Sequence, residues 1–449
     1  MKASTIKFAV LDWVSKLSML ILLLMPFHAF LTVWFSSFIG HYTALRLWKE
    51  VLLVLCVLGV LFMLAFDQKI RSHTMTRRLV WLILAYTGLN LIWGLLALNQ
   101  HDVTAKALGY GLISNLRFVA FFLVTWAAAL RLQRLRVKGQ WLVLTPALIV
   151  VVIALLQIFI LPNDFLTHFG YGSSTIPAVE TVNSNSHYIR ATSTLRGANP
   201  LGAYLVIPIS LLTVLLLRKT RNWWYAAFLA ASLIALFFSY SRSAMVGAAL
   251  SVIIILFLSR MSHTSQRRAL GIVAGLAIAS ILLLIPLRHN SHVENLLFHT
   301  ETHSAVKTTS DHNHYSAVKM NFQDFMSHKL GRGPGTAGPA SYYNTGHPYR
   351  LAENYFIQIG QELGIIGLLL FLLINAGVGY LLWGRRADPL ALSLFASLIG
   401  LSFINFFSHA WTDDTLAYVW WGLAGIAMVK LPEPVEEYHG KRSKSKKKK

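Results

Sequence analysis

The sequence predicts an all-α, polytopic membrane protein with about twelve transmembrane helices and a large extracytoplasmic loop before the tenth helix. Hydrophobic residues make up 55% of the 449 residues, whereas charged residues make up only 13%. The mean hydropathy is +0.55. Apolar runs of about 18 to 22 residues recur along the chain, and this length crosses the hydrocarbon core of a bilayer. The composition therefore excludes a soluble multidomain protein.

The apolar runs define the predicted spans, which are joined mostly by short connections. They lie near residues 16–36, 48–66, 79–98, 107–130, 141–161, 199–217, 222–238, 243–259, 269–287, 355–383, 389–409 and 415–430. No convincing small-residue cleavage site follows the first run, so we expect it to be retained as a span. Cys56 is the only cysteine in the sequence, so no intrachain disulfide is expected.

The basic residues set the predicted orientation. If the N-terminus is cytoplasmic, most of the 40 Lys and Arg residues fall in cytoplasmic segments, as the positive-inside rule requires. Both termini are then cytoplasmic. The tail KRSKSKKKK carries part of the formal charge of +22, and we expect it to be disordered and attracted to anionic lipid head groups. No nucleic-acid-binding motif accompanies this tail, so the lipid bilayer is favoured over RNA as its partner.

The chain divides into three predicted regions. These are residues 1–198 with the first five spans and a long outer loop, residues 199–430 with the other spans and a second outer loop at 288–352, and the polybasic tail at 431–449. Within the second loop, residues 293–306 and 314–330 have apolar side chains near helical spacing. This pattern predicts amphipathic helices at the membrane interface.

Three arginines at the ends of the outer connections are candidate phosphate ligands. Arg190 and Arg196 precede a span that begins at Asn199-Pro200, and Arg242 lies where the chain re-enters the membrane. A guanidinium group matches phosphate oxygens and stays charged, so these arginines are suited to clamp a diphosphate. A helix N-terminus beside them also favours an anion. The alternative is that each arginine extends to lipid head groups.

Two further polar features have mainly structural interpretations. Arg117 lies in the middle of a span, where insertion into the membrane costs about 2.5 to 3.5 kcal/mol. We therefore expect it to pair with a group inside the bundle, or to reach a substrate phosphate directly or through a neighbouring residue. The histidines of HTETH (299–303) and DHNH (311–314) do not form the HExxH metal motif. We therefore expect a solvated loop and no metal site.

The stretch from Gly331 to Gly367 is the candidate catalytic segment. It begins with Gly331, Gly333 and Gly335, which permit positive φ and close backbone approach, although an ordinary turn has the same composition. Glu353 stands just before the tenth span, where partial desolvation would raise its pKa and suit it as a general base for a sugar hydroxyl. The alternative is a helix cap. His347 is the second candidate base.

Four segments, taken together, match one protein family. They are Arg190 to Pro200 with the pattern R-x-x-x-T-hydrophobic-x-x-x-N-P, SRSAMVG (Ser241 to Gly247), the G-x-G-x-G turn (Gly331 to Gly335), and ENYFIQIGQELGIIG (Glu353 to Gly367). In this order, they resemble the O-antigen ligase and polymerase superfamily of bacterial envelope glycosyltransferases. The resemblance covers residues 185–410 well, and the N-terminal spans only by topology. The last segment is the most specific.

The resemblance implies a GT-C-like fold and a transfer reaction in the bacterial cytoplasmic (inner) membrane. A glycan on an undecaprenyl-diphosphate-type carrier would pass, at the outer face, to a hydroxyl of a glycan, lipid or protein acceptor. The transfer would invert the anomeric carbon and use no metal or other cofactor. Arg190 and Arg242 would hold the diphosphate and stabilise it as the leaving group. Many ligases of the superfamily carry His-Asn where this chain has Glu353-Asn354, so the resemblance leaves ligase and polymerase open.

Two other classes of membrane protein compete with this interpretation. A lipid-linked glycan transporter or flippase would show paired broken helices and ionisable groups near the middle of the membrane, where the sequence places only Arg117. A peptidoglycan glycosyltransferase of the shape and division type also has many spans and an outer catalytic loop. The segment from Glu353 to Gly367 favours the O-antigen superfamily over the peptidoglycan glycosyltransferase.

Overall fold

The structure is a computed structural model. It describes residues 2–75, 77–182, 185–218, 222–259, 264, 267, 271 and 310–430. Three predictions lie wholly or almost wholly outside the described residues: the span at 269–287, the helix at 293–306 and the polybasic tail.

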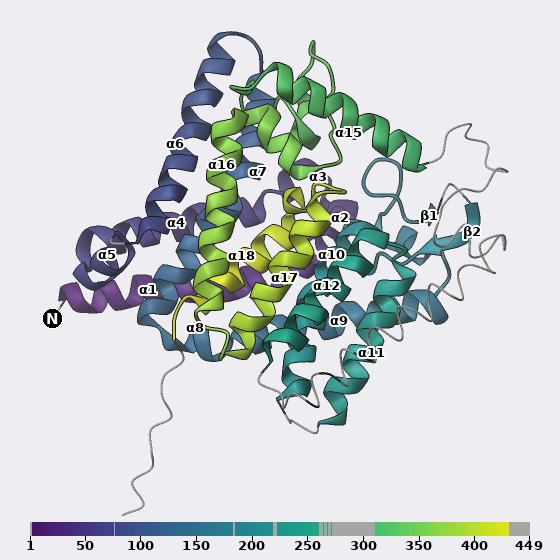
Figure 1. The fold of residues 1–449 in the computed structure, drawn as a ribbon, viewed down its shortest axis with the longest axis horizontal. Coiled ribbons are helices and arrows are strands. Elements are labelled where there is room, and N and C mark those ends of the chain that lie inside the picture. Colours follow the sequence, from purple (N-terminus) through teal and green to yellow (C-terminus); the bar gives the residue numbers. More distant parts are fainter. Residues whose placement is uncertain are drawn as a thin grey trace, which may run out of the picture.

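The described chain folds into a bundle of α-helices with one small β-hairpin at its side (Figure 1). The helices are α1 (Lys2–Leu24), α2 (His28–Ile39), α3 (Tyr42–Leu45), α4 (Trp48–Phe66), α5 (Gln68–Met75), α6 (Arg78–Asn99), α7 (Ala105–Arg131), α8 (Gln133–Val137), α9 (Gly139–Phe159), α10 (Ala198–Leu217), α11 (Trp223–Phe238), α12 (Arg242–Leu258), α15 (Ser310–Ser327), α16 (Tyr355–Trp383), α17 (Pro389–Asn405) and α18 (Asp414–Ala427). Short 3₁₀ helices are η1 (Met25–Phe27), η2 (Phe165–Phe169), η4 (Gly338–Tyr343) and η5 (Ala410–Thr412), and the hairpin pairs β1 (Glu180–Val182) with β2 (Asn185–Arg190).

The all-α membrane class is confirmed by helices that are long and apolar enough to cross a bilayer. Seven such segments occur among the described residues: Ile6–Ile39, Tyr42–Phe66, Arg78–Asn99, Ala105–Arg131, Gly139–Phe159, Ala198–Leu217 and Tyr355–Trp383. Three further apolar helices, α11, α12 and α17, are shorter. The predicted number of twelve spans is therefore not confirmed, although the predicted limits 48–66 and 355–383 coincide with α4 and α16.

The first predicted span, 16–36, lies within the longer apolar segment Ile6–Ile39, which is not one continuous α-helix. Helix α1 already begins at Lys2, and the 3₁₀ turn η1 separates it from α2. Pro26 lies in this turn. Proline has no backbone N–H to donate and its ring crowds the preceding turn, which accounts for a break at this position.

Helix α16 is broken at Gly364, where φ is +69° and ψ is −169°. Two carbonyl groups just before the break accept hydrogen bonds from the glycine-rich turn instead of from the helix. Arg332 N donates to Gln361 O at 2.9 Å, and Gly333 N donates to Glu362 O at 2.8 Å. A break inside an apolar helix needs such partners, because unpaired backbone groups are costly in an apolar environment.

The turn between Gly331 and Gly335 requires its glycines. Gly331, Gly333 and Gly335 have φ of +81°, +98° and +89°, so the predicted positive φ is confirmed. A Cβ added at Gly331 would collide with the backbone N of Gly364, and one at Gly335 would collide with the carbonyl O of Ala107. The turn is therefore packed between α7 and the break in α16.

The fully buried Glu362 carboxylate fixes the turn from the helix side. Its Oε1 accepts a hydrogen bond from Gly335 N at 2.8 Å, and its Oε2 accepts one from Asn115 Nδ2 of α7 at 2.7 Å. Buried carboxylates are tolerated when their oxygens are paired in this way.

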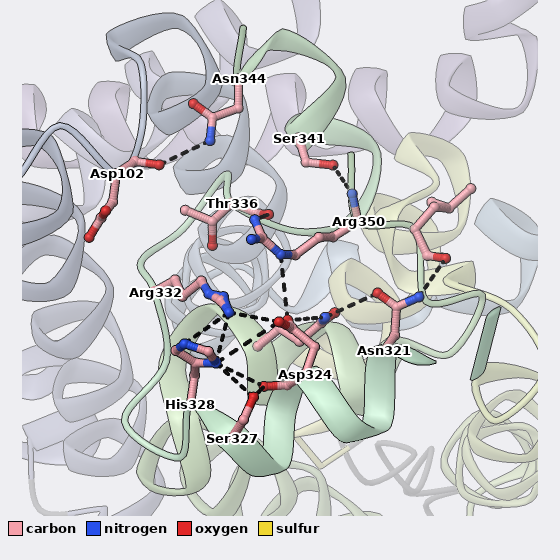
Figure 2. Close-up of polar contacts among 12 residues, drawn as sticks. Asp102, Asn321, Asp324, Ser327, His328, Arg332, Thr336, Ser341, Asn344 and Arg350 are labelled. Atoms are coloured by element: carbon pink, nitrogen blue, oxygen red, sulfur yellow. Dashed lines mark hydrogen bonds and ion pairs between the residues drawn. The ribbon is translucent and has the colours of Figure 1, made fainter. Parts of the chain in front are cut away.

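Helix α15 lies across one end of the bundle, and Asp324 ties it to its neighbours (Figures 1 and 2). The Asp324 carboxylate lies 2.7 Å from Arg332 Nη2 and 3.5 Å from Arg350 Nε, and it accepts a hydrogen bond from Gln361 Nε2 at 2.8 Å. Residues 314–330 were predicted to be helical, which α15 confirms up to Ser327. We call this end of the bundle, which carries α15 and η4, the loop end.

The opposite end of the bundle carries α8 (Figure 1). Three ion pairs join segments there: Arg131 with Asp67, Arg134 with Asp12, and Arg136 with Asp388. They connect α1, the α4–α5 joint, α8 and the α16–α17 connection. Several connections that the charge distribution assigns to one side of the membrane are thus held together.

Helix α18 is the centre of the bundle. From Thr415 to Ala427, every residue is buried. Gly422 and Gly425 allow α7 to approach closely, since a Cβ at these positions would collide with Phe121 and Thr125. Small residues commonly serve this purpose between membrane helices.

Candidate active site

The chain between Arg190 and Arg196 is irregular yet buried within the bundle. Its backbone groups are paired by Gln157 of α9, whose Oε1 accepts hydrogen bonds from Thr192 N at 3.1 Å and from Ser193 N at 2.9 Å. Buried backbone outside helices and strands requires such pairing. The segment is therefore held in place, and it fixes the backbone of the arginine at each of its ends.

Arg190 is held by hydrogen bonds and lies close to Arg242. Its Nε donates to Ser239 O at 2.9 Å, and its Nη2 donates to Asn199 Oδ1 at 2.6 Å. Burial lowers the pKa of Arg190; Glu180, 3.9 Å away, raises it, and the positive charge of Arg242 lowers it further. The structure thus brings two of the three predicted phosphate ligands within electrostatic range of each other.

Backbone strain gathers near the predicted site residues. Among the described residues, the non-glycine positions with positive φ are His41, His101, Ser193, Tyr240 and Glu353. Tyr240 lies two residues before Arg242, and Glu353 is itself a candidate base. Uncommon backbone conformations of this kind cluster at functional sites.

Asn354, rather than Glu353, is the N-cap of α16. Its Oδ1 accepts a hydrogen bond from Ile357 N at 3.0 Å, and its Nδ2 donates to Phe406 O at 3.0 Å. Glu353 precedes the cap, is half-buried and has φ of +49°. Its carboxylate is thus not needed to cap the helix.

His409 connects Glu353 with Arg196. Its Nδ1 atom is buried and has no hydrogen-bond partner among the described residues. Burial lowers the pKa of His409 to about 4; Arg196 lowers it as well, and Glu353 raises it. The imidazole is therefore neutral at pH 7, and both charged side chains lie within electrostatic range of it.

His409 is a site residue that the sequence analysis missed. It belongs to the polar run SHAWTDD (408–414), whose first two residues fall within the predicted span 389–409 and whose other residues form a simple connection to the span 415–430. The structure ends α17 earlier, at Asn405, so that His409 lies outside the helix and just before η5. The sequence feature that could have indicated a site here is the presence of His409, Asp413 and Asp414 between two apolar helices.

Arg196 faces a polar pocket next to this segment. The pocket is lined by His28, Ala29, Thr32, Tyr42, Arg46, Ile176, Arg196, Asp413, Asp414 and Thr415. Asp413 caps α18 by accepting a hydrogen bond from Leu416 N at 3.1 Å. Burial raises the pKa of Asp413, Arg196 lowers it, and Asp414 raises it.

Arg117 pairs inside the bundle, as one of its two sequence interpretations predicts. Its terminal nitrogens donate to the Asp414 carboxylate and to Thr412 O. Asp414 also lies 3.0 Å from Lys49 Nζ and 3.4 Å from His28 Nε2. Both terminal nitrogens of Arg117 are thus bonded to protein groups.

His347, the second candidate base, lies on an exposed turn after η4. Its backbone N–H donates to Asn344 O at 3.1 Å, and its side chain is exposed. Of the two candidate bases, only Glu353 lies beside the Arg196–His409 group by the interactions described above.

Residues 227–372 match the family model described as O-Antigen ligase. The resemblance to the O-antigen ligase and polymerase superfamily is thereby confirmed over these residues. No curated protein matches the chain.

The superfamily segment and the rest of the chain supply different parts of the candidate site. Arg242, the glycine turn and Glu353 lie inside the matched segment, whereas Arg190 and Arg196 lie before it. Every residue that lines the polar pocket also lies outside the matched residues. An O-antigen ligase-type core is thus combined with surroundings that the family model does not cover.

Proposed function

We propose that this protein is a membrane glycosyltransferase that moves a glycan from a polyprenyl-diphosphate carrier to an acceptor hydroxyl. The Arg190–Arg242 pair is the observation that carries the proposal. Two guanidinium groups, one of them largely buried, lie within electrostatic range of each other, and Glu180 opposes the repulsion between them at Arg190. A diphosphate between them would relieve this repulsion.

Arg190 is suited to hold the leaving group. Its Nε and Nη2 bond to protein acceptors, so the orientation of the guanidinium is fixed. Its Nη1 has the Glu180 carboxylate 3.9 Å away as its recorded partner, which is beyond hydrogen-bond distance. A fixed cation with an available donor stabilises the charge that develops on the diphosphate as the glycosidic bond breaks.

Glu353 is the proposed general base. Its carboxylate would take the proton of the acceptor hydroxyl while that oxygen attacks the anomeric carbon and the carrier diphosphate departs with the bonding electrons. Attack opposite the leaving group inverts the anomeric carbon. A neutral His409 beside Glu353 adds no positive charge that would weaken the base. We further propose that the reaction takes place at the outer face of the cytoplasmic membrane without a metal ion.

The test is transfer by the purified protein in detergent and EDTA, supplied with a polyprenyl-diphosphate-linked glycan and followed on gels. A ladder of longer lipid-linked products identifies a polymerase, and product only after a lipid or protein acceptor is added identifies a ligase. We expect Arg190→Ala and Arg242→Ala each to lower the transfer rate by about 10² to 10³-fold without unfolding the protein. Near-normal turnover by either variant contradicts the shared clamp.

Two single substitutions in the same assay decide between the candidate bases. We expect Glu353→Gln to lower the rate by about 10² to 10⁴-fold with little change in donor binding, because an amide cannot accept the proton. His347→Gln is the matched control at the exposed alternative. If the rate falls only in His347→Gln, the base is His347.

A further inference from the structure

We propose that Arg46 and Arg196 form a subsite for an acidic group on the glycan, a sugar carboxylate or a phosphate substituent. The proposal rests on the proposed transfer function and names the class of glycan. Arg46 follows α3 and Arg196 precedes α10, and both line the polar pocket described above.

The charges in the pocket are unequally paired. Asp414 already contacts three basic groups, those of Lys49, Arg117 and His28. In the described part of the chain, neither Arg46 nor Arg196 forms an ion pair or donates a side-chain hydrogen bond. The guanidinium groups of Arg46 and Arg196 are therefore available to a ligand. The second carboxylate of the pocket, that of Asp413, caps α18.

Asp413 interacts with Arg196 over a distance but forms no close ion pair with either arginine among the described residues. Its carboxylate caps α18 through Leu416 N, and no ion pair of 4.0 Å or less joins it to either arginine within the described residues. The guanidinium group of an arginine is planar and presents several N–H donors, so it binds a carboxylate or a phosphate in preference to a neutral hydroxyl. The pocket therefore favours an acidic ligand over a neutral one.

An aromatic ring beside Arg46 suits a sugar ring. The guanidinium of Arg46 lies 5.8 Å from the ring centre of Tyr42, which also lines the pocket. A flat apolar face beside positive charges is the chemistry that an acidic saccharide requires.

The subsite adjoins the proposed base but differs from the proposed diphosphate clamp. Arg196 acts electrostatically on His409, which Glu353 also reaches. Arg190 is instead influenced by Arg242 and Glu180. A glycan donor that has its diphosphate at Arg190 and its glycan towards Arg196 would bind to the diphosphate clamp and to the subsite at once.

Binding to the full-length protein in detergent micelles, measured by calorimetry, tests the proposal. The probes are a hyaluronan tetrasaccharide for carboxylates, mannose 6-phosphate for phosphates, neutral tetraacetylchitotetraose, and geranylgeranyl diphosphate for the carrier. We expect at least one acidic probe to bind, and Arg46→Gln and Arg196→Gln each to weaken it by about tenfold or more. Arg71→Gln, which removes an exposed arginine of α5, is the matched control and should bind as the wild type does.

Several results would overturn the subsite. These are failure of both acidic probes to bind, equal affinity for the neutral tetrasaccharide, or unchanged binding by Arg46→Gln. A loss of geranylgeranyl diphosphate binding in Arg46→Gln would assign the pocket to the carrier diphosphate instead. Acidic-probe binding without any transfer activity would retain the subsite and reject the proposed transferase, so the two failures are distinguishable.

Discussion

Arg117, Arg46 and Arg196 all lie near the carboxylate of Asp414. They differ in whether they form an ion pair with a protein carboxylate. Arg117 donates directly to Asp414 and is almost fully buried. Arg46 and Arg196 line the pocket beside Asp414 and have no ion pair among the described residues. The positive charge of Arg117 is balanced by Asp414, whereas Arg46 and Arg196 are two positive charges without an ion pair among the described residues. In an apolar bundle, this difference separates an arginine whose charge is balanced by a carboxylate of the fold from arginines that, in the proposed subsite, would bind an acidic ligand.

The Arg117 network would be expected to tolerate little change, because removal of one partner leaves other charges buried. In contrast, the pocket arginines can be replaced without leaving a carboxylate unpaired. Replacing Arg117 and replacing Arg46 or Arg196 can therefore be compared within one protein, to distinguish a structural arginine from a ligand-binding one. Three substitution experiments test this comparison, beginning with the largest expected effect.

Arg117→Met should strongly destabilise the protein, because Asp414 and Glu50, whose Oε1 lies 3.8 Å from Arg117 Nη1, would be left with fewer positive partners. Breaking a buried ion pair costs about 3 to 5 kcal/mol, so we expect a clearly lower thermal midpoint in detergent. Arg46→Met is the control and should unfold near the wild-type temperature. Equal destabilisation by the two substitutions would remove the distinction drawn above.

Asp324→Asn should have an intermediate effect that is confined to the loop end. It weakens the ion pairs to Arg332 and Arg350, which are partly exposed, so we expect a loss of about 1 to 2 kcal/mol or less. Hydrogen exchange should become faster in α15 and in the turn at Gly331–Gly335. Asp164→Asn, at an exposed carboxylate outside this cluster, is the control. Protection that is unchanged in α15 would show that Asp324 does not anchor it.

His409 should contribute the smallest effect, a dependence of stability on acid. Its folded-state pKa of about 4 is below the ordinary value of about 6.5, so the unfolded chain binds a proton first as the pH falls. Stability is therefore unaffected by this group above about pH 6.5 and is lost between about pH 6.5 and 4. The thermal midpoint of His409→Gln should fall less between pH 7.5 and 5 than that of the wild type. His347→Gln controls for removal of an imidazole, and identical pH profiles for wild type and His409→Gln would contradict the assignment.

The sequence predicts the helical membrane fold well because apolar length is a strong and local signal. The limits of α4 and α16 follow from the composition alone, and the glycine turn has the predicted backbone conformation. The break at Pro26 was not anticipated, since a proline inside an apolar run does not always interrupt a helix. The predicted number of spans is not confirmed, because described helices such as α18 are apolar but shorter than a bilayer crossing.

The candidate site was predicted only in part, because the decisive contacts join distant segments. The proximity of Arg190 to Arg242 was expected from the family resemblance. Arg196 lines the same pocket as Arg46, 150 residues earlier in the sequence, because the fold brings these distant segments together, and no local pattern encodes this. His409 was missed because the predicted spans included it within a helix.

The break in α16 has a consequence for how this chain can change over evolution. A Cβ at Gly331 would occupy the space of the Gly364 backbone, and one at Gly364 would occupy the space of the Leu330 backbone. Neither position can acquire a side chain while the other segment keeps its path. Homologues that lose one of these glycines must therefore reroute the other segment as well, so the two positions are expected to be inherited as a unit although 33 residues separate them in the chain.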